Sequence, residues 1–90
     1  MEFEWDSAKA VQNARKHGVT FHEAATVFGD ALGITVNDPD HSRDEKRYIV
    51  IGWSSRGRVL MVAHAQRSGR IRIISARTLT RRERRDYEAT

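Results

Sequence analysis

The stretch that most constrains the fold is Arg70–Arg77, with the sequence Arg-Ile-Arg-Ile-Ile-Ser-Ala-Arg. Polar and apolar residues alternate with the period of a β-strand, and the alternation changes phase at Ile73-Ile74. A strand with isoleucines on both faces is expected inside a sheet and not at its edge. Arg70, Arg72 and Arg77 are always charged and have the shape to bind phosphate or carboxylate. We therefore expect an anion beside this strand.

Further strand patterns precede this stretch, with turn residues between them. Lys46–Trp53 alternates and is rich in β-forming residues, and Arg58–Gln66 is a second run. Ser68-Gly69 is a tight connection from this run to the arginine-bearing strand. Ile34–Val36 has strand composition and is expected as a fourth strand. The sequence predicts an antiparallel meander and leaves open the register across Ser68-Gly69.

The first predicted helix is Ser7–His17. Asp6 precedes it as an N-cap, and Gly18 follows where a left-handed residue ends a helix. Its apolar residues at helical spacing are Ala8, Val11 and Ala14.

Two capping-box patterns predict the remaining helices. Thr20 with Glu23 begins a short second helix that ends at Gly29-Asp30, and Thr80 with Glu83 begins a basic helix to about residue 88. The expected architecture is α+β: two N-terminal helices packed on a four-stranded antiparallel sheet, followed by a short C-terminal helix. Ninety residues are expected to form a single domain over residues 1–90.

The charge is divided unequally along the chain. Residues 1–45 hold 4 Lys/Arg and 9 Asp/Glu, a net −5, whereas residues 46–90 hold 12 and 3, a net +9. This asymmetry favours a basic surface for a polyanion, with nucleic acid as the first candidate. The alternatives are a solvated basic face and internal pairing between the acidic and basic halves.

Several classes of protein are excluded or disfavoured by composition. The chain has no cysteine, which excludes disulfides, cysteine-ligated zinc and thiol chemistry. No apolar run approaches the length of about 20 residues that a membrane span needs, and the start of the chain does not resemble a signal peptide. We expect a cytoplasmic protein without membrane contact. The four histidines show no metal-binding spacing, so neither a metal site nor a cofactor is expected.

Arginines are the first candidates for phosphate binding, and other residues must carry protons. Arg67, Arg72 and Arg77 can hold a phosphate and stabilise charge on it, but arginine does not exchange protons readily. Candidate proton carriers are His64, Glu83 and Tyr87, with His17, His41 and Glu45 as further candidates. Each has a structural alternative in the core, in a helix cap or in helix packing. Basic residues expected to contact RNA are Lys16, His17, Arg47, Arg58, Arg70 and Arg81.

The chain also resembles a known family over nearly its whole length. The residues that carry the resemblance include Phe3-Glu-Trp-Asp6, Lys9, Asn13, Lys16-His17-Gly18-Val19, Phe21, Glu23-Ala24, Val27-Phe28, Asp40-His41-Ser42, Glu45, Arg47-Tyr48, Gly52, Gly57-Arg58, Leu60, Arg67, Arg72–Arg77, Glu83-Arg84 and Tyr87-Glu88. The order of the segments KHGV, HSxxExRY and RIISAR is specific. In these positions the chain resembles the BrnT toxins.

The resemblance implies a RelE-like fold and a type II toxin that blocks translation by cutting RNA. It also implies a BrnA-like antitoxin with a ribbon-helix-helix part, which neutralises the toxin and connects it to operator DNA. In RelE-like toxins, basic and tyrosine side chains act on the phosphate without a metal ion. Carried onto this chain, the resemblance implies roles for Arg67, Arg72, Arg77 and Tyr87.

We therefore predict a metal-independent endoribonuclease in which the 2′-OH attacks the adjacent phosphate. The alternative is a non-catalytic module that binds RNA or an acidic protein through the same arginines.

Overall fold

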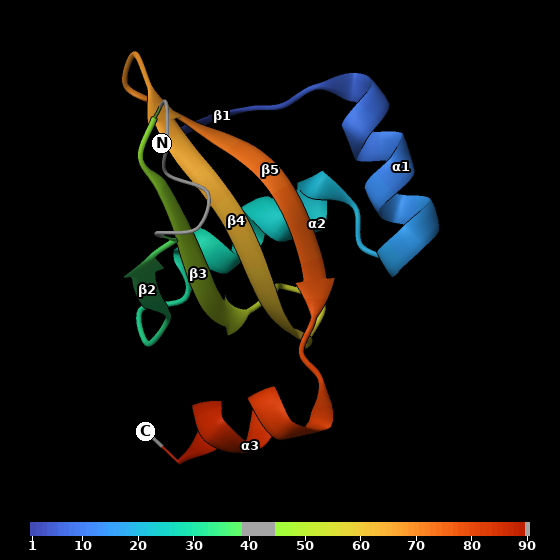
Figure 1. Ribbon diagram of the computed structural model, residues 1–90, viewed down its shortest axis with the longest axis vertical. Helices are drawn as coiled ribbons and strands as arrows, with labels where there is room; N and C mark the ends of the chain where they lie inside the picture. The colour runs from blue at the N-terminus through green and yellow to red at the C-terminus, as the bar shows by residue number, and fades with distance from the viewer. Residues whose placement is uncertain (39–44, 90) are drawn as a thin grey trace.

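The computed structural model describes residues 1–38 and 45–89, which form a five-stranded sheet with three α-helices and one 3-10 turn (Figure 1). The strand order across the sheet is β1-β5-β4-β3-β2. The elements are β1 Glu2–Glu4, α1 Ser7–His17, α2 Phe21–Thr26, η1 Val27–Gly29, β2 Ile34–Asn37, β3 Arg47–Trp53, β4 Val59–Arg67, β5 Arg70–Thr78 and α3 Arg81–Glu88. No helix in the described part of the chain is long and apolar enough to cross a membrane.

The sheet is mixed and has one strand more than the four antiparallel strands that the sequence predicted. Strands β2 to β5 are antiparallel neighbours, as predicted. The fifth strand, β1, pairs in parallel with β5, with Glu2 opposite Arg70 and Glu4 opposite Arg72. The pairing of β1 was not predicted because β1 has only 3 residues, too few for an alternating pattern to identify a strand, and because its partner β5 lies far along the chain.

The connection between β4 and β5 is a two-residue hairpin loop. Arg67 pairs directly with Arg70, which fixes the register that the sequence left open. Ser68 and Gly69 both have positive φ, 50° and 78°. Positive φ at both central residues is the geometry of a type I′ turn, whose twist matches that of the two strands.

The change of phase in β5 is a β-bulge at Ile74. Ala63 of β4 pairs with Ser75 and the next residue, His64, pairs with Ile73, so Ile74 is skipped. Arg72 and Arg77 are five residues apart, a spacing that puts side chains on opposite faces of a regular strand. The bulge brings both arginines to the same face.

The position of β5 in the sheet differs along its length. It has β4 on one side throughout, but on the other side β1 covers only Arg70–Arg72. Beyond that point α1 lies beside β5 (Figure 1). The expectation of an interior strand therefore holds for the first part of β5 only.

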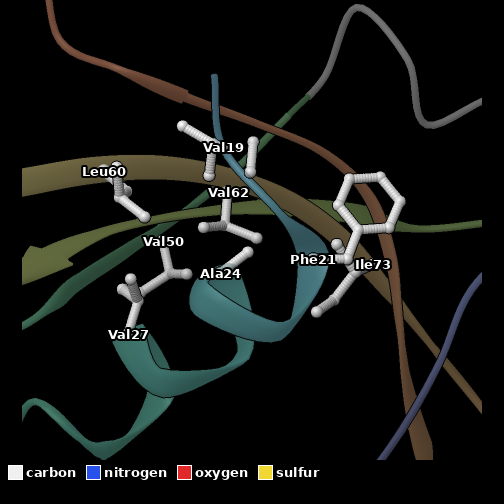
Figure 2. Packing of buried hydrophobic residues seen from close by; sticks show 9 residues of the cluster. Val19, Phe21, Ala24, Val27, Val50, Leu60, Val62 and Ile73 are labelled. Carbon is white, nitrogen blue, oxygen red and sulfur yellow. The ribbon is translucent and has the colours of Figure 1, made fainter. Parts of the chain in front are cut away.

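The core lies between α2 and one face of the sheet. Figure 2 shows Phe21, Ala24 and Val27 directed toward strand residues that include Val62 and Ile73. The buried cluster consists of Val19, Phe21, Ala24, Val27, Val50, Leu60, Val62, Ile73 and Ala76.

Helix α1 has the predicted bounds but buries a different face. Asp6 accepts a hydrogen bond from the Lys9 backbone N–H, and Gly18 has the left-handed conformation expected of the C-cap. Val11, predicted on the apolar face, is 52% exposed, and the buried residue is Asn13. The Asn13 side chain bonds both the N–H and the C=O of Ala76, at 3.1 and 2.8 Å. This amide fastens α1 to β5.

The capping box predicted for α2 is only half formed. Thr20 accepts the hydrogen bond from the Glu23 backbone N–H, but the Glu23 carboxylate does not return to Thr20. Instead it is buried and accepts hydrogen bonds from Arg58 and Ser54. Two charge-assisted bonds from a guanidinium outweigh one local capping bond.

Helix α3 lies below the sheet and apart from the other helices (Figure 1). Its capping box between Thr80 and Glu83 is complete, as predicted. None of its residues is buried. Its contacts with the sheet include the ion pair of Arg77 with Glu83 and the stacking of Arg84 over the exposed Trp53 ring.

Candidate functional site

The face of the sheet that α2 does not cover carries a row of charged residues. Val62 and Ile73 lie in the core, so their neighbours on each strand point to the opposite face, called here the open face. On this face Arg47 of β3, Ala65 of β4, Arg72 of β5 and Glu4 of β1 lie opposite one another. Arg72 donates a hydrogen bond to Glu4 at 3.0 Å.

A second row lies beside the first, at the end of the sheet nearest the hairpin. It holds Arg67 and Arg70, with Glu2 opposite Arg70. Arg67 donates two hydrogen bonds to Glu45, at 3.0 and 3.2 Å. We use the name arginine cluster for Arg47, Arg67 and Arg72 with their carboxylates Glu4 and Glu45.

Arg77 shares the open face but is separated from the arginine cluster. It pairs with Met61, whereas Arg72 pairs with Ala65, four residues further along β4. At a rise of about 3.3 Å per residue the two positions are about 13 Å apart, too far to bind one phosphate. Arg77 instead donates hydrogen bonds to Glu83 from both terminal guanidinium nitrogens, Nη1 and Nη2, at 2.7 and 2.9 Å. The three arginines named from the sequence therefore form two groups.

The charges of the cluster control the ionisation of Glu45. The hydrogen bond from Arg67 lowers the pKa of the Glu45 carboxyl, and the nearby charges of Arg47 and Arg72 lower it further. The same pair raises the pKa of Arg67. Glu45 is therefore ionised at neutral pH, where it can accept a proton but has none to donate.

Two of the proposed proton carriers lie away from the arginine cluster. His64 is 5% exposed on the core side of the sheet, between the rings of Phe28 and Tyr48. Burial lowers its pKa, and its Nδ1 lies 3.3 Å from the Val62 carbonyl oxygen. Glu83 is committed to Arg77 and the Thr80 cap, which lower its pKa to about 2. These contacts keep Glu83 beside Arg77 and away from the arginine cluster.

The remaining candidates are distributed over three regions. Tyr87 lies on α3 in a hollow with Leu32, Ile34 and Glu88. His17 lies at the end of α1. His41 is outside the described residues. Among the candidates in the described residues, Glu45 is thus the proton carrier that the structure brings to the arginine cluster, whereas Glu83 is paired with Arg77.

The basic residues predicted to contact RNA are also dispersed. Arg58 is bound to the buried Glu23, Arg70 is at the exposed hairpin tip, and Arg47 belongs to the arginine cluster. Arg81 lines a shallow hollow on α3 with Arg84 and Arg85. Lys16 and His17 line a groove between α1 and β5.

Sequence reasoning named the arginines but missed most of their partners. Arg58 with Glu23, Arg67 with Glu45 and Arg72 with Glu4 each join the basic half of the chain to the acidic half. The unequal distribution of charge between the two halves of the chain was the signal for these ion pairs, because internal pairing between the halves was one interpretation of it. Which carboxylate meets which arginine depends on the register of β1 and β3. Among residues 1–38 and 45–89 no group of His, Asp and Glu has the arrangement of a metal site.

Comparisons with known proteins agree with this fold. A family model described as the ribonuclease toxin BrnT of type II toxin–antitoxin systems matches residues 5–83. A crystal structure at 1.1 Å resolution of the Brucella abortus ribonuclease toxin BrnT superposes with a TM-score of 0.66 and 20% sequence identity, covering 90% of this chain and 99% of that one. At this identity the likeness shows the fold alone. No curated protein matches the chain by sequence.

Proposed function

The chain belongs to the BrnT family, ribonuclease toxins of type II toxin–antitoxin systems, and from this premise we propose that it cleaves RNA at the arginine cluster without a metal ion. The observation that carries the proposal is the meeting of two strand arginines with one ionised carboxylate on the open face, Arg67 and Arg72 with Glu45. Guanidinium groups bind phosphate oxygens, and a carboxylate accepts a proton.

In the proposed reaction an RNA phosphate competes with Glu45 and Glu4 for the guanidinium groups of Arg67 and Arg72. The released Glu45 carboxylate takes the proton of the adjacent 2′-OH, whose oxygen forms a new bond to phosphorus. The bond from phosphorus to the 5′ oxygen breaks, and water protonates that oxygen. Arg47, Arg67 and Arg72 stabilise the extra negative charge on the phosphoryl oxygens during this step. The products are a 2′,3′-cyclic phosphate and a 5′-OH.

The proposal changes the roles of residues named from the sequence. Arg77 and Glu83 hold α3 against the sheet and act as positioning residues. Tyr87 lies on α3, so its position relative to bound RNA depends on how α3 is held against the sheet. His64 is left out because its ring is buried on the other face of the sheet.

The family also implies a partner. Type II systems pair the toxin with a protein antitoxin, and we propose that this one is BrnA-like, with a ribbon-helix-helix part that binds operator DNA. The toxin then reaches DNA only through the antitoxin. We further propose that residues 1–90 act as one RelE-like domain in the cytoplasm.

The test is RNA cleavage by the purified protein in EDTA. The substrates are a labelled RNA and the same sequence with 2′-deoxyribose at the cleaved position. We expect cleavage of the first with cyclic-phosphate ends and none of the second, because the deoxy sugar lacks the nucleophile. Cleavage of both substrates, or ends with a 5′-phosphate, contradicts the proposed mechanism.

A second candidate function is a non-catalytic module that binds RNA or a protein. It is favoured by the carboxylates that already occupy Arg67, Arg72 and Arg77. In that case no RNA is cut in EDTA, while RNA binding weakens steeply with salt.

A further inference from the structure

The cations of α1 differ from those of the sheet in their partners. Arg67, Arg72 and Arg77 each have a carboxylate within 3.0 Å. Lys9 and Lys16 have no ion-pair partner in the described part of the chain. Positive charge that the protein does not neutralise internally is available to an anionic ligand.

These cations line a groove of about 260 Å³ between α1 and β5. One wall is a stripe of α1 formed by Lys9, Gln12, Asn13, Lys16 and His17, which recur at helical spacing. The other wall is Ile74 and Ser75, at and beside the bulge. At Ile74 and Ser75, β5 has no strand on the side that faces α1, because β1 pairs only with Arg70–Arg72. The groove lies along this unpaired edge.

The helix dipole does not account for the whole stripe. Cations in the last turn stabilise the C-terminal end of a helix, which explains Lys16 and His17. Lys9 is in the first turn, where that effect is unfavourable for a cation. Lys9 and Lys16 are seven residues apart, about 10.5 Å along the helix axis, and both line the groove.

The groove begins beside the arginine cluster. The hydrogen bond from the Lys9 backbone N–H lowers the pKa of Asp6, and the charges of Lys9 and Arg72 lower it further. In the backbone, β1 ends at Glu4 opposite Arg72 and α1 begins three residues later at Ser7, so the first turn of α1 starts near Arg72. Ser75 shares the open face with Ala63 and also lines the groove. A strand bound at the cluster thus has a path over the β5 edge.

We propose that this groove binds the phosphodiester backbone of single-stranded RNA outside the cleaved position. The inference rests on the proposed function, because it extends the same substrate. Lys9 and Lys16 contact phosphates, Gln12 and Ser75 supply neutral hydrogen-bonding groups, and Ile74 forms an apolar floor. The groove makes binding depend on RNA length and not on base identity.

The test compares Lys9→Ala/Lys16→Ala with Arg15→Ala. Arg15 is exposed on the same helix next to Lys16 but does not line the groove, so its loss controls for removing one positive charge from α1, half of the charge that the double variant loses. The probes are fully 2′-O-methylated RNAs of 3 and 12 nucleotides, which cannot be cleaved, with affinity measured by fluorescence anisotropy at several salt concentrations. Cleavage of an unmodified trinucleotide by the native protein is measured in parallel.

We expect the double variant to bind the 12-mer about tenfold more weakly, with the salt slope reduced by about 0.7 for each lysine. The loss for the 3-mer is expected to be several-fold smaller, and Arg15→Ala is expected to bind like the native protein. The groove would be overturned if the double variant and Arg15→Ala lost RNA affinity equally. It would also be overturned if the double variant lost affinity equally for the 3-mer and the 12-mer. Unchanged RNA binding with weakened antitoxin binding would also overturn it and assign the groove to an acidic protein segment.

The parallel measurement separates this inference from the proposed function. If the native protein cleaves the trinucleotide but the double variant and Arg15→Ala bind the 12-mer equally well, the groove is refuted and the proposed reaction is not. If the double variant loses affinity for the 12-mer as expected but the native protein cleaves no RNA, the proposed reaction is refuted and the groove is not.

Discussion

Arg67 and Glu45 form a two-point contact on the open face, with Nε donating to Oε2 at 3.0 Å and Nη2 donating to Oε1 at 3.2 Å. Both side chains are partly exposed, at 49% and 28%. An exposed ion pair contributes little to stability, so an RNA phosphate can displace the carboxylate at small cost. In the proposed reaction the pair therefore keeps the phosphate-binding group and the proton acceptor adjacent to each other.

Substitution of the cluster arginines tests this arrangement. We expect Arg67→Ala and Arg72→Ala each to lower kcat by about 10²-fold or more, because each removes charge stabilisation from the phosphoryl group. Arg82→Ala is the control, since Arg82 is exposed on α3 and lines none of the sites described above. The rates are measured with a short RNA at saturating concentration. Equal rates for Arg72→Ala and Arg82→Ala would exclude Arg72 from the reaction.

The Glu23–Arg58 pair is expected to stabilise the fold. Glu23 is buried and Arg58 donates two hydrogen bonds to it, so Arg58→Met leaves the carboxylate with the Ser54 hydroxyl as its main partner. We expect a loss of about 2 kcal/mol, equivalent to a fall in Tm of roughly 8–16 °C for a domain of this size. Arg56→Ala, at 4.0 Å from the same carboxylate and 71% exposed, should change little.

The same pair makes a prediction for pH. Hydrogen bonds from Arg58, and secondarily from Ser54, lower the pKa of Glu23 below its ordinary value of 4.5. Its contribution to stability is complete above pH 4.5 and is lost as the pH falls through the lowered pKa. The difference in Tm between the native protein and Arg58→Met should therefore shrink between pH 5 and 3. A difference that stays constant over this range would contradict the assignment.

The Arg77–Glu83 pair is expected to anchor α3. Since α3 buries no residue, Arg77→Ala should raise amide hydrogen exchange in residues 81–88 while exchange in β3 and β4 changes little. The pKa of Glu83 is about 2, so the anchor should persist in the native protein at pH 4. Protection of α3 that is the same in Arg77→Ala and Arg82→Ala would show that the stacking of Arg84 on Trp53 is sufficient.

The hairpin turn provides a further test of the β4–β5 register. Ser68 has φ of 50°, a conformation that asparagine tolerates better than most residues and valine poorly. In urea unfolding we expect Ser68→Asn to be as stable as the native protein or slightly more stable, and Ser68→Val to lose about 1–2 kcal/mol. Equal stability of the two variants would contradict a type I′ turn.

Local signals predicted much of this fold because they act within a few residues. Asp6 and Gly18 defined α1 correctly, and Thr80 with Glu83 defined the start of α3. The same local pattern failed at Glu23, because its partner Arg58 lies 35 residues away in the sequence and no local signal indicates that contact. The parallel pairing of β1 with β5 was not predicted for the same reason.

The candidate site was predictable in part. Arginines on a strand imply a nearby anion whatever the register of the strand, so the sequence was sufficient to name Arg67 and Arg72 as candidates for phosphate binding. Their separation from Arg77 depends on the bulge at Ile74, and the choice of Glu45 depends on where the chain enters β3. These are consequences of sheet pairing, which a single sequence does not reveal.

The account depends most directly on the role of Glu45. The decisive measurement is the rate of RNA cleavage by Glu45→Gln in EDTA, with affinity for a 2′-O-methylated RNA measured on the same sample. We predict a loss of cleavage of about 10²–10⁴-fold, the usual contribution of a general base, with RNA affinity equal to or higher than that of the native protein. Cleavage at the native rate by Glu45→Gln would contradict the proposed mechanism.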